Sequence, residues 1–442
     1  EFANNCDFIN TTFGSGNVSF YKTDFKGVTV DFSNVDFGEG SINFQFADFG
    51  TGDVIFENGA NYNGNTTFIN ANFGDGNVNF KNFNFGLGNV DFHFAKFGIG
   101  DISFDKSEFN GKYVDFRKVE FGEGKLDFRK TTFGNALVSF EEIEHKKGRT
   151  YFKRATFGSG NISFDMADFG NEEVSFEAAE FGTGSLSMLR TISKSITFKS
   201  CQLKTYIDLR VSRCECIDLS DTIIRDIIDL KKGKTELELN TLILTGVRNL
   251  GKIFLDWKEN KVKTLIESQN STDLDKSNQF RLLKEDFHSS GKYNDEDKAY
   301  VAFKRYELKA YNSSKINSNG FNRLWVYPVS FGKKLIFDWM GLYATNPLRV
   351  LISMLCTYVL FSITYLCMIH WGIGDLKPGF SPPEELSEMA ISFYHSAITF
   401  LTIGYGDYSP WGTIRMVSSI EGFVGLFLMS YFTVAFVRKI LR

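Results

Sequence analysis

Phenylalanine recurs along the first part of the chain with alternating gaps of five and seven residues, from Phe8 to Phe181. Only Asn61 and His145 replace it in phase, so the period is twelve residues without an insertion or deletion. Fifteen copies run from residue 13 to residue 192, and nine of them begin Phe-Gly-x-Gly. A fixed period of this kind indicates stacked structural repeats rather than an ordinary globular core.

Each copy has the pattern of short strands joined by tight corners. In the copy that starts at Phe85, apolar Val90 and Phe92 alternate with polar neighbours, as in a half-buried strand. The pair Gly86 and Gly88 marks a turn, where we expect positive φ angles. A helix is excluded because two interior glycines would cost about 2 kcal/mol in such a copy. Stacked copies would place phenylalanine on phenylalanine inside a solenoid.

The repeat resembles that of pentapeptide-repeat proteins, in which a small residue stands two positions before a large apolar one. Ala95 before Phe97 matches this pattern, whereas a two-residue insertion in every second unit departs from it. The resemblance implies a right-handed β-helix with four sides, which gives about seven turns and roughly 35 Å at ~4.8 Å per rung. One copy per turn remains an alternative. After Phe198 leucine and isoleucine replace phenylalanine, and we expect residues 1–245 to form the solenoid and its cap.

Residues 246–320 change to a helical pattern. Phe280 and Phe287 fall on one helical face, and Gly291 marks a stop before a second helix. We expect a helical hairpin, which acts either as a simple spacer or as a lever between its neighbours. Residues 321–345 are aromatic and interrupted by polar positions, which predicts an amphipathic segment at a membrane surface.

Two apolar stretches, residues 348–370 and 412–437, are long enough to cross a bilayer as helices. Basic residues flank the outer ends of the spans and acidic residues dominate the loop between them, with Arg415 as the exception. The basic residues are Lys333, Lys334, Arg349, Arg438, Lys439 and Arg442, and the acidic ones are Asp375, Glu384, Glu385 and Glu388. This asymmetry predicts both termini and the solenoid in the cytoplasm. The scattered cysteines and the lack of a signal-peptide pattern agree with a solenoid in the reducing cytoplasm. We expect the two spans to lie in a plasma membrane, specifically a prokaryotic inner membrane.

A shorter apolar stretch, residues 389–401, lies between the spans and predicts a re-entrant helix, because it is too short to cross. Thr402-Ile403-Gly404-Tyr405-Gly406-Asp407 follows it directly. This order of outer helix, pore helix, signature and inner helix resembles the two-helix potassium channel pore family over residues 345–440. We therefore expect a pore module over residues 346–442. The resemblance implies K⁺ sites formed by the filter residues Thr402, Ile403, Gly404, Tyr405 and Gly406.

The chemistry of such a filter explains the residue types. Gly404 and Gly406 reach backbone conformations that other residues resist, so that successive carbonyls can face one axis and replace the water around an ion. The resemblance further implies a homotetramer, because one chain supplies only one strand of the filter. It places Tyr405 against the pore helix near Tyr394 and His395, and it places Asp407 at the outer mouth.

Three residues of the second span are gating candidates. Gly422 and Gly425 lie near the position of the hinge in the family, although close helix packing is an equal alternative. Glu421 is an ionisable residue inside a span, which makes it a functional candidate or a hydrogen-bonding link between helices. No arginine-rich helix is present in the sequence, so voltage gating by that route is not expected.

The sequence predicts a multidomain, non-enzymatic protein in which a β-solenoid precedes a helical hairpin and an all-α, two-span pore module. A net charge of -4 gives no indication of nucleic-acid binding, and no nucleophile–base pair or organic-cofactor motif stands out. Our main hypothesis is a potassium channel, with K⁺ as the permeant ion, that its cytoplasmic solenoid regulates or anchors. The alternative is a membrane-tethered scaffold whose solenoid recruits a partner protein or ligand.

Overall fold

The computed structural model describes residues 5–232, 238–316, 322–379 and 386–441. Three of the charged residues that flank the two apolar stretches lie outside these described residues, namely Glu384, Glu385 and Arg442. The chain divides into two compact units, Glu1–Glu296 and Asp297–Arg442.

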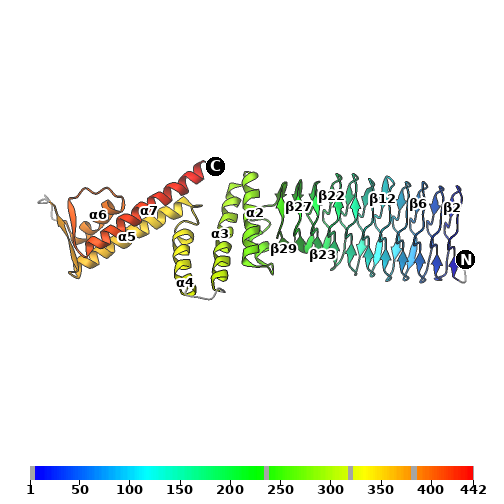
Figure 1. Ribbon diagram of the computed structural model, residues 1–442, viewed down its shortest axis with the longest axis horizontal. Coiled ribbons are helices and arrows are strands. Elements are labelled where there is room, and N and C mark those ends of the chain that lie inside the picture. The colour runs from blue at the N-terminus through cyan, green and yellow to red at the C-terminus, as the bar shows by residue number, and fades with distance from the viewer. Residues whose placement is uncertain (1–4, 233–237, 317–321, 380–385, 442) are drawn as a thin grey trace. The chain divides into compact units, whose positions relative to one another are not determined.

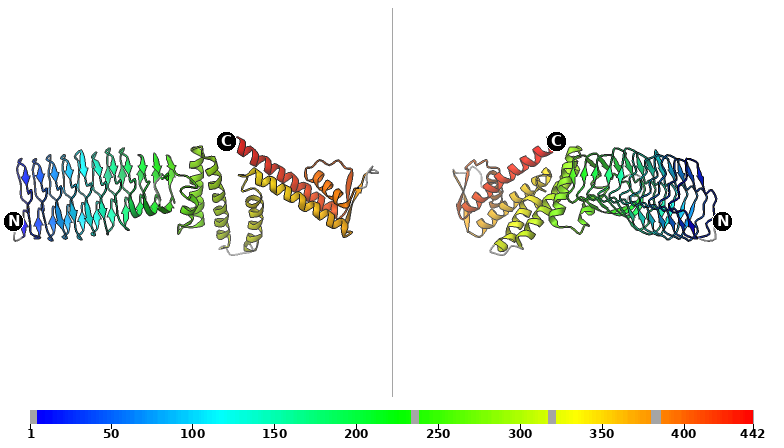
Figure 2. Two further views of the ribbon diagram at one scale, coloured as in Figure 1. Left: turned by 180° about the vertical axis from the view of Figure 1, so that it is seen from behind. Right: turned by 45° about the vertical axis from the view of Figure 1, so that its right-hand side comes forward.

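The first unit is built on parallel strands that repeat every 24 residues. Val30 pairs with Val54, and Val54 pairs with Val78, so one turn of the solenoid takes two sequence copies rather than one. The two longest stacks have eleven strands each and span about 48 Å at ~4.8 Å per rung; the roughly 35 Å expected refers to the fifteen copies alone, and the stacks also include the coils after residue 192. Figure 1 shows these rungs in order along the blue-to-green part of the chain, and Figure 2 shows them from behind.

The first long stack consists of β1 Cys6–Asp7, β3 Val30–Asp31, β5 Val54–Ile55, β8 Val78–Asn79, β11 Ile102–Ser103, β14 Leu126–Asp127, β17 Thr150–Tyr151, β20 Glu173–Ser175, β23 Ile192–Thr197, β26 Arg213–Asp218 and β29 Glu238–Ile243. The second consists of β2 Val18–Ser19, β4 Ile42–Asn43, β6 Thr66–Thr67, β9 Val90–Asp91, β12 Tyr113–Asp115, β15 Leu137–Ser139, β19 Ile162–Ser163, β22 Leu186–Ser187, β25 Ile207–Asp208, β28 Ile227–Asp229 and β31 Lys252–Phe254.

Two shorter stacks, extended by isolated bridges, complete the four sides. One contains β7 Asn72–Gly74, β10 Lys96–Phe97, β13 Glu120–Gly122 and β16 Glu144–His145. The other contains β18 Thr156–Phe157, β21 Glu180–Phe181, β24 Gln202–Leu203, β27 Ile223–Ile224 and β30 Arg248–Asn249. The four-sided coil implied by the pentapeptide resemblance is therefore the one observed.

Phenylalanine rings fill the interior in continuous stacks. The Phe92 ring is 4.6 Å from Phe68 in one neighbouring coil and 4.9 Å from Phe116 in the other. The glycine pair has two separate roles, which corrects the expectation of two positive φ angles. Gly86 has φ of 64°, whereas a Cβ on Gly88 would lie 1.9 Å from the Gly64 carbonyl oxygen of the preceding coil. The second glycine is thus needed for the close approach of coils.

The solenoid ends later than residue 245. Ile228 pairs with Ile253, and β31 continues to Phe254. Leu244, Ile253 and Leu255 are buried, so aliphatic side chains take over the interior positions where the phenylalanine and glycine pattern has stopped. The end was predicted too early because the sequence signal depended on phenylalanine, whereas the coil requires only an apolar side chain at these positions.

Three helices follow: α1 Val262–Glu267, α2 Asp273–Ser289 and α3 Tyr293–Ile316. Helix α2 begins at a capping box between Thr272 and Asp275 and buries Phe280 and Phe287, which confirms the predicted face. Gly291 follows α2 with φ of 69°, as expected of a helix stop.

The second unit contains α4 Asn322–Lys333, the π-helix η1 Lys334–Trp339, α5 Pro347–His370, β32 Gly374–Pro378, α6 Glu388–Phe400, β33 Tyr408–Gly412 and α7 Ile414–Ile440. Among the described residues, α5 and α7 are long and apolar enough to cross a membrane. The predicted segment 321–345 becomes α4 and η1, which expose Trp325, Tyr327 and Phe331. Helix α7 begins later than residue 412, because Gly412 pairs with Gly374 in an antiparallel hairpin of β32 and β33.

Candidate functional site

The segment Thr402–Asp407 emerges directly from the short helix α6. Ser387 caps the start of α6, where its hydroxyl accepts a hydrogen bond from the Ala390 amide. At the other end, the amides of Ile403 and Gly404 both donate to the Ile398 carbonyl, at 2.8 and 3.4 Å. Helix α6 thus fixes the start of the segment. From Thr402 to Gly406 the backbone forms neither a helix nor a strand.

The backbone of this segment is irregular in the way that the sequence predicts. Gly404 has φ of 64° and Gly406 has φ of 76°, both in the left-handed region that favours glycine. Thr402 also has a positive φ, 56°, and its hydroxyl donates to the Leu401 carbonyl at 2.7 Å. Such backbone inside a membrane is tolerated only where protein or a water-filled cavity surrounds it.

Residues Thr402 to Gly406 are all exposed in the single chain. The Tyr405 side chain is 71% exposed, and its packing against Tyr394 and His395 stays a prediction for an assembled protein. In the single chain this segment is therefore open to solvent. It consists of the residues that the sequence assigns to ion contact.

Asp407 is held in place by α6 and by the Gly379 backbone. The Tyr394 hydroxyl donates to an Asp407 carboxylate oxygen at 2.7 Å, and the Gly379 amide donates to the Asp407 carbonyl at 2.7 Å. The Tyr394 ring also meets the Tyr408 ring edge-on, with centroids 6.1 Å apart. The structure therefore brings together Tyr394 and Asp407, two residues that the sequence assigned to support and outer mouth.

Glu421 lies completely buried at the junction of α5, α6 and α7. Its carboxylate accepts hydrogen bonds from the Tyr365 hydroxyl of α5 and from the Ser396 hydroxyl of α6, both at 2.5 Å. Nearby, Ser418 contacts the Tyr365 hydroxyl at 3.2 Å and the His395 imidazole at 2.7 Å. Each helix of the module thus contributes a side chain to one buried polar network.

Sequence reasoning missed Tyr365, Ser396 and Ser418. The available signal was the rule that an ionisable group inside a span has a partner, which directs attention to hydroxyls on neighbouring helices. Several hydroxyls occur in α5 and α6, so the sequence could not decide which of them reach Glu421. The pairing depends on how the three helices cross.

The two glycines of α7 differ sharply in their surroundings. A Cβ added to Gly425 would lie 2.1 Å from the Phe400 carbonyl oxygen at the end of α6. A Cβ added to Gly422 would meet nothing within 4 Å. The structure therefore supports the packing interpretation for Gly425, since no larger residue fits between α7 and the end of α6.

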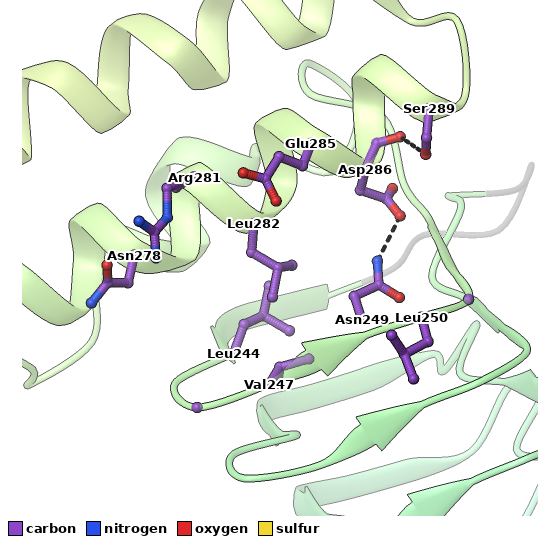
Figure 3. A pocket seen from close by; sticks show the side chains of 12 residues that line it. Leu244, Val247, Asn249, Leu250, Asn278, Arg281, Leu282, Glu285, Asp286 and Ser289 are labelled. Atoms are coloured by element: carbon purple, nitrogen blue, oxygen red, sulfur yellow. Dashed lines mark hydrogen bonds between the residues drawn. The ribbon is translucent and has the colours of Figure 1, made fainter.

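The first unit has a separate feature, a cleft of about 580 Å³ between the last coil and α2. In Figure 3, Arg281 and Glu285 of α2 lie above Leu244 and Val247 of the coil. Beside it, buried Asp286 accepts hydrogen bonds from the Asn249 amide group at 2.8 Å and from the Ile253 amide at 3.0 Å.

These contacts close the C-terminal end of the solenoid. A second buried side chain of α2, Gln279, accepts a hydrogen bond from the Leu244 amide at 2.8 Å. Burial raises the pKa of Asp286, although the amide donors oppose this effect. Helix α2 therefore supplies acceptors to backbone donors that an open sheet edge would leave unpaired.

Comparison with known proteins adds one finding to this geometry. Neither the curated proteins nor the solved structures gave a match. Residues 353–442 match the family model described as an ion channel, and this range contains most of α5 together with α6, Thr402–Asp407 and α7. The match is to a channel and not to an enzyme, in agreement with the sequence prediction. The chain thus carries an ion-channel domain at its C-terminus, preceded by a β-solenoid of phenylalanine-rich, pentapeptide-type repeats.

Proposed function

We propose that the chain is one subunit of a homotetrameric, potassium-selective channel with Thr402–Gly406 as its selectivity filter. The observation that carries this proposal is the signature itself, placed between the end of α6 and the start of α7 within the ion-channel match. Rings of backbone carbonyls replace the hydration shell of K⁺ in such filters. Glycine at 404 and 406, both with positive φ, suits a backbone whose carbonyls must point along one axis.

The exposure of this segment supports an assembly of four chains. Ile403 is 47% exposed and Tyr405 is 71% exposed, although both are large apolar or aromatic side chains next to membrane-length helices. Four copies around one axis would cover these side chains and would surround an ion with one strand from each copy. A single chain offers an ion only one side of such a site.

Charge supports a cytoplasmic solenoid. Lys333 and Lys334 precede the first span, and Arg438 and Lys439 follow the second, so both flanks carry basic residues on the same side of the membrane. Exposed aromatic residues of α4 and η1 suit an interfacial position beside the first span. We place the protein in a plasma membrane with the filter mouth and Asp407 outside.

Glu421 acts in this proposal as a link that positions the pore helix. Both of its oxygens accept from hydroxyl donors on two different helices, so removing the carboxylate breaks the side-chain link between α5, α6 and α7. Since α6 carries the base of the filter, a shift of α6 would displace the carbonyls that face the ion. Glu421 is thus expected to support selectivity rather than to line the conduction path.

The test is flux through the purified full-length protein in liposomes. We expect K⁺ flux that greatly exceeds Na⁺ flux, because the intact Gly-Tyr-Gly preserves the ring of carbonyls. Gly404→Ala should abolish K⁺ flux, since alanine resists φ of 64°. Ile403→Val is the matched control and should retain selectivity, because it changes a side chain and leaves the backbone carbonyl. Equal K⁺ and Na⁺ permeability would refute the selectivity, and the absence of any flux would refute the channel.

A further inference from the structure

Two basic residues at the end of α7 contact one acidic residue of α3. The Arg438 guanidinium lies 3.1 Å from an Asp297 carboxylate oxygen, and the Lys439 ammonium lies 3.2 Å from the other. The Arg438 guanidinium also lies over the Tyr300 ring, 4.5 Å from its centroid. Asp297 and Tyr300 are neighbours on one face of α3, because they are three residues apart.

Burial makes this contact more than a surface ion pair. The Asp297 side chain is 10% exposed and the Arg438 side chain is 21% exposed. Exposed pairs are screened and contribute little, whereas removing one partner of a buried pair leaves a charge without compensation. This contact therefore holds the end of α7 to α3, and its loss should cost more free energy than the loss of an exposed ion pair.

A second contact holds α3 to the segment before α5. The Arg305 guanidinium donates two hydrogen bonds to buried Asp338 of η1, at 2.9 and 2.8 Å. This bidentate arrangement is charge-assisted and geometrically restrictive. The Tyr431 hydroxyl of α7 in turn donates to the Phe337 carbonyl at 3.1 Å and accepts from the Ala344 amide at 3.0 Å. Helix α3, η1 and α7 thus form one connected set.

Helix α3 is continuous from Tyr293 to Ile316, and its first turn belongs to the unit that contains the solenoid. A helix transmits displacement along its axis because its hydrogen bonds make it stiff. The residues from Asp297 onward belong to the unit that contains α7. Any displacement of the start of α3 would therefore act on the end of α7 through Asp297.

We propose that the contact of Asp297 with Arg438 and Lys439 is a latch through which α3 controls the cytoplasmic end of the inner helix and so the opening of the pore. The latch rests on the proposed channel function, in which α7 lines the pore. It assigns to α3 the role of lever rather than spacer. It also makes Asp297 a regulatory residue far in sequence from the filter.

The experiment is single-channel recording of the full-length protein in lipid bilayers. Asp297→Asn should change the ratio of open to closed times by about 5- to 150-fold, the range of ordinary coupling between sites. The Arg438→Gln, Lys439→Gln double variant should change it in the same direction. Combining all three substitutions should add nothing further, because they break the same contact.

Glu307→Gln is the matched control. Glu307 is also an acid of α3, but it is half exposed and pairs with Lys304 of the same helix, so its loss should leave the ratio unchanged. Asp297→Glu keeps the charge and should restore most of the wild-type ratio. If Asp297→Asn does not assemble, Lys439→Gln keeps the Arg438 pair and should give a smaller shift in the same direction as Arg438→Gln.

Two results would overturn the latch: a wild-type ratio in Asp297→Asn, or fully additive effects in the combined variant. The ratio of K⁺ to Na⁺ permeability should stay unchanged in every latch variant, because the filter is not touched. Failure of the channel itself would appear differently, as a wild-type protein without K⁺ current.

Discussion

At the scale of single residues, the structural role of a glycine in this chain does not follow from its position in the sequence. Gly422 and Gly425 lie three residues apart in α7, and the resemblance to potassium channels makes both of them hinge candidates. Only Gly425 meets another element, with the Phe400 carbonyl oxygen 2.1 Å from the place of a Cβ. Close contact with α6, and not flexibility, is the physical reason for glycine at 425.

We predict that Gly425→Ala disrupts the channel, whereas Gly422→Ala is tolerated. The added methyl group at 425 collides with backbone and should destabilise each subunit by about 1–3 kcal/mol, the usual cost of overpacking. The measurement is the thermal stability of the purified assembly together with its K⁺ current. Gly422→Ala provides the control on the same helix, and equal loss in both variants would contradict the packing argument.

At the scale of the element, the solenoid accommodates breaks in its own repeat. Asn61 occupies a phenylalanine position, and Phe83 fills the space that this leaves, 6.3 Å from Phe37 and 4.6 Å from Phe85. Gly59 permits this exchange, because a Cβ there would lie 2.7 Å from the Phe83 ring. Interior volume is thus conserved over neighbouring coils and not within each one.

His145 is the other residue that replaces phenylalanine in the repeat, and hydrogen bonds accommodate it in the interior. Its Nε2 lies 2.8 Å from the Gly124 carbonyl and its Nδ1 lies 2.9 Å from the Thr150 hydroxyl. Burial lowers the pKa of His145, so the ring is neutral, with Nε2–H donating to the carbonyl and Nδ1 accepting from threonine. The Asn61 side-chain amide likewise donates to Thr66, at 3.0 Å. Each of the two polar residues that replace phenylalanine is thus followed five positions later by a threonine that pairs with it.

Restoring the repeat at Asn61 should succeed only if its neighbours change with it. Asn61→Phe alone should lower the stability of the solenoid by about 1–3 kcal/mol, because Phe83 already fills the space. Adding Phe83→Ala and Thr66→Val should recover the loss, since both residues then match the rest of the repeat. Chemical denaturation of the full-length protein, followed by the β-sheet signal in circular dichroism, measures this difference. A stable Asn61→Phe single variant would show that the interior has spare room.

At the scale of the whole molecule, two compact units with different stabilising forces share one continuous helix, α3. The unit Glu1–Glu296 depends on stacked rings and hydrogen bonds between coils that hold within a single chain. The unit Asp297–Arg442 exposes Thr402–Gly406, the proposed filter, in the single chain, so its stability should depend on assembly. The two units are therefore expected to respond differently to ions.

We predict that replacing K⁺ by Na⁺ lowers the dissociation temperature of the tetramer without changing the unfolding of the solenoid. An ion that binds only the assembled filter stabilises the assembly by mass action, whereas the solenoid offers no such site in our proposal. Native mass spectrometry and size-exclusion chromatography after heating would report the tetramer, and circular dichroism would report the solenoid. A dissociation temperature that is the same in both salts would contradict the assigned ion sites.

Features that depend on local pattern can be predicted from the chain without its three-dimensional structure. Alternating gaps of five and seven predicted inward-facing phenylalanines, because side chains of a strand alternate between its faces. The lengths of the apolar stretches predicted two spans and a shorter helix, because bilayer thickness sets the length of a spanning helix. The order of residues 402 to 407 led to the proposal of a filter, which needs no tertiary information.

Only the tertiary structure decided which distant residues meet. It paired copies 24 residues apart, extended the strands to Phe254 and joined Gly374 to Gly412. It also placed Tyr365 and Ser396 on Glu421 and brought Asp297 to the end of α7, 141 residues away. These contacts depend on how the coils stack and how helices cross, and neither is encoded in the spacing of nearby residues. The physical reason is that many hydroxyls and charges satisfy the local pattern equally well, and packing selects among them.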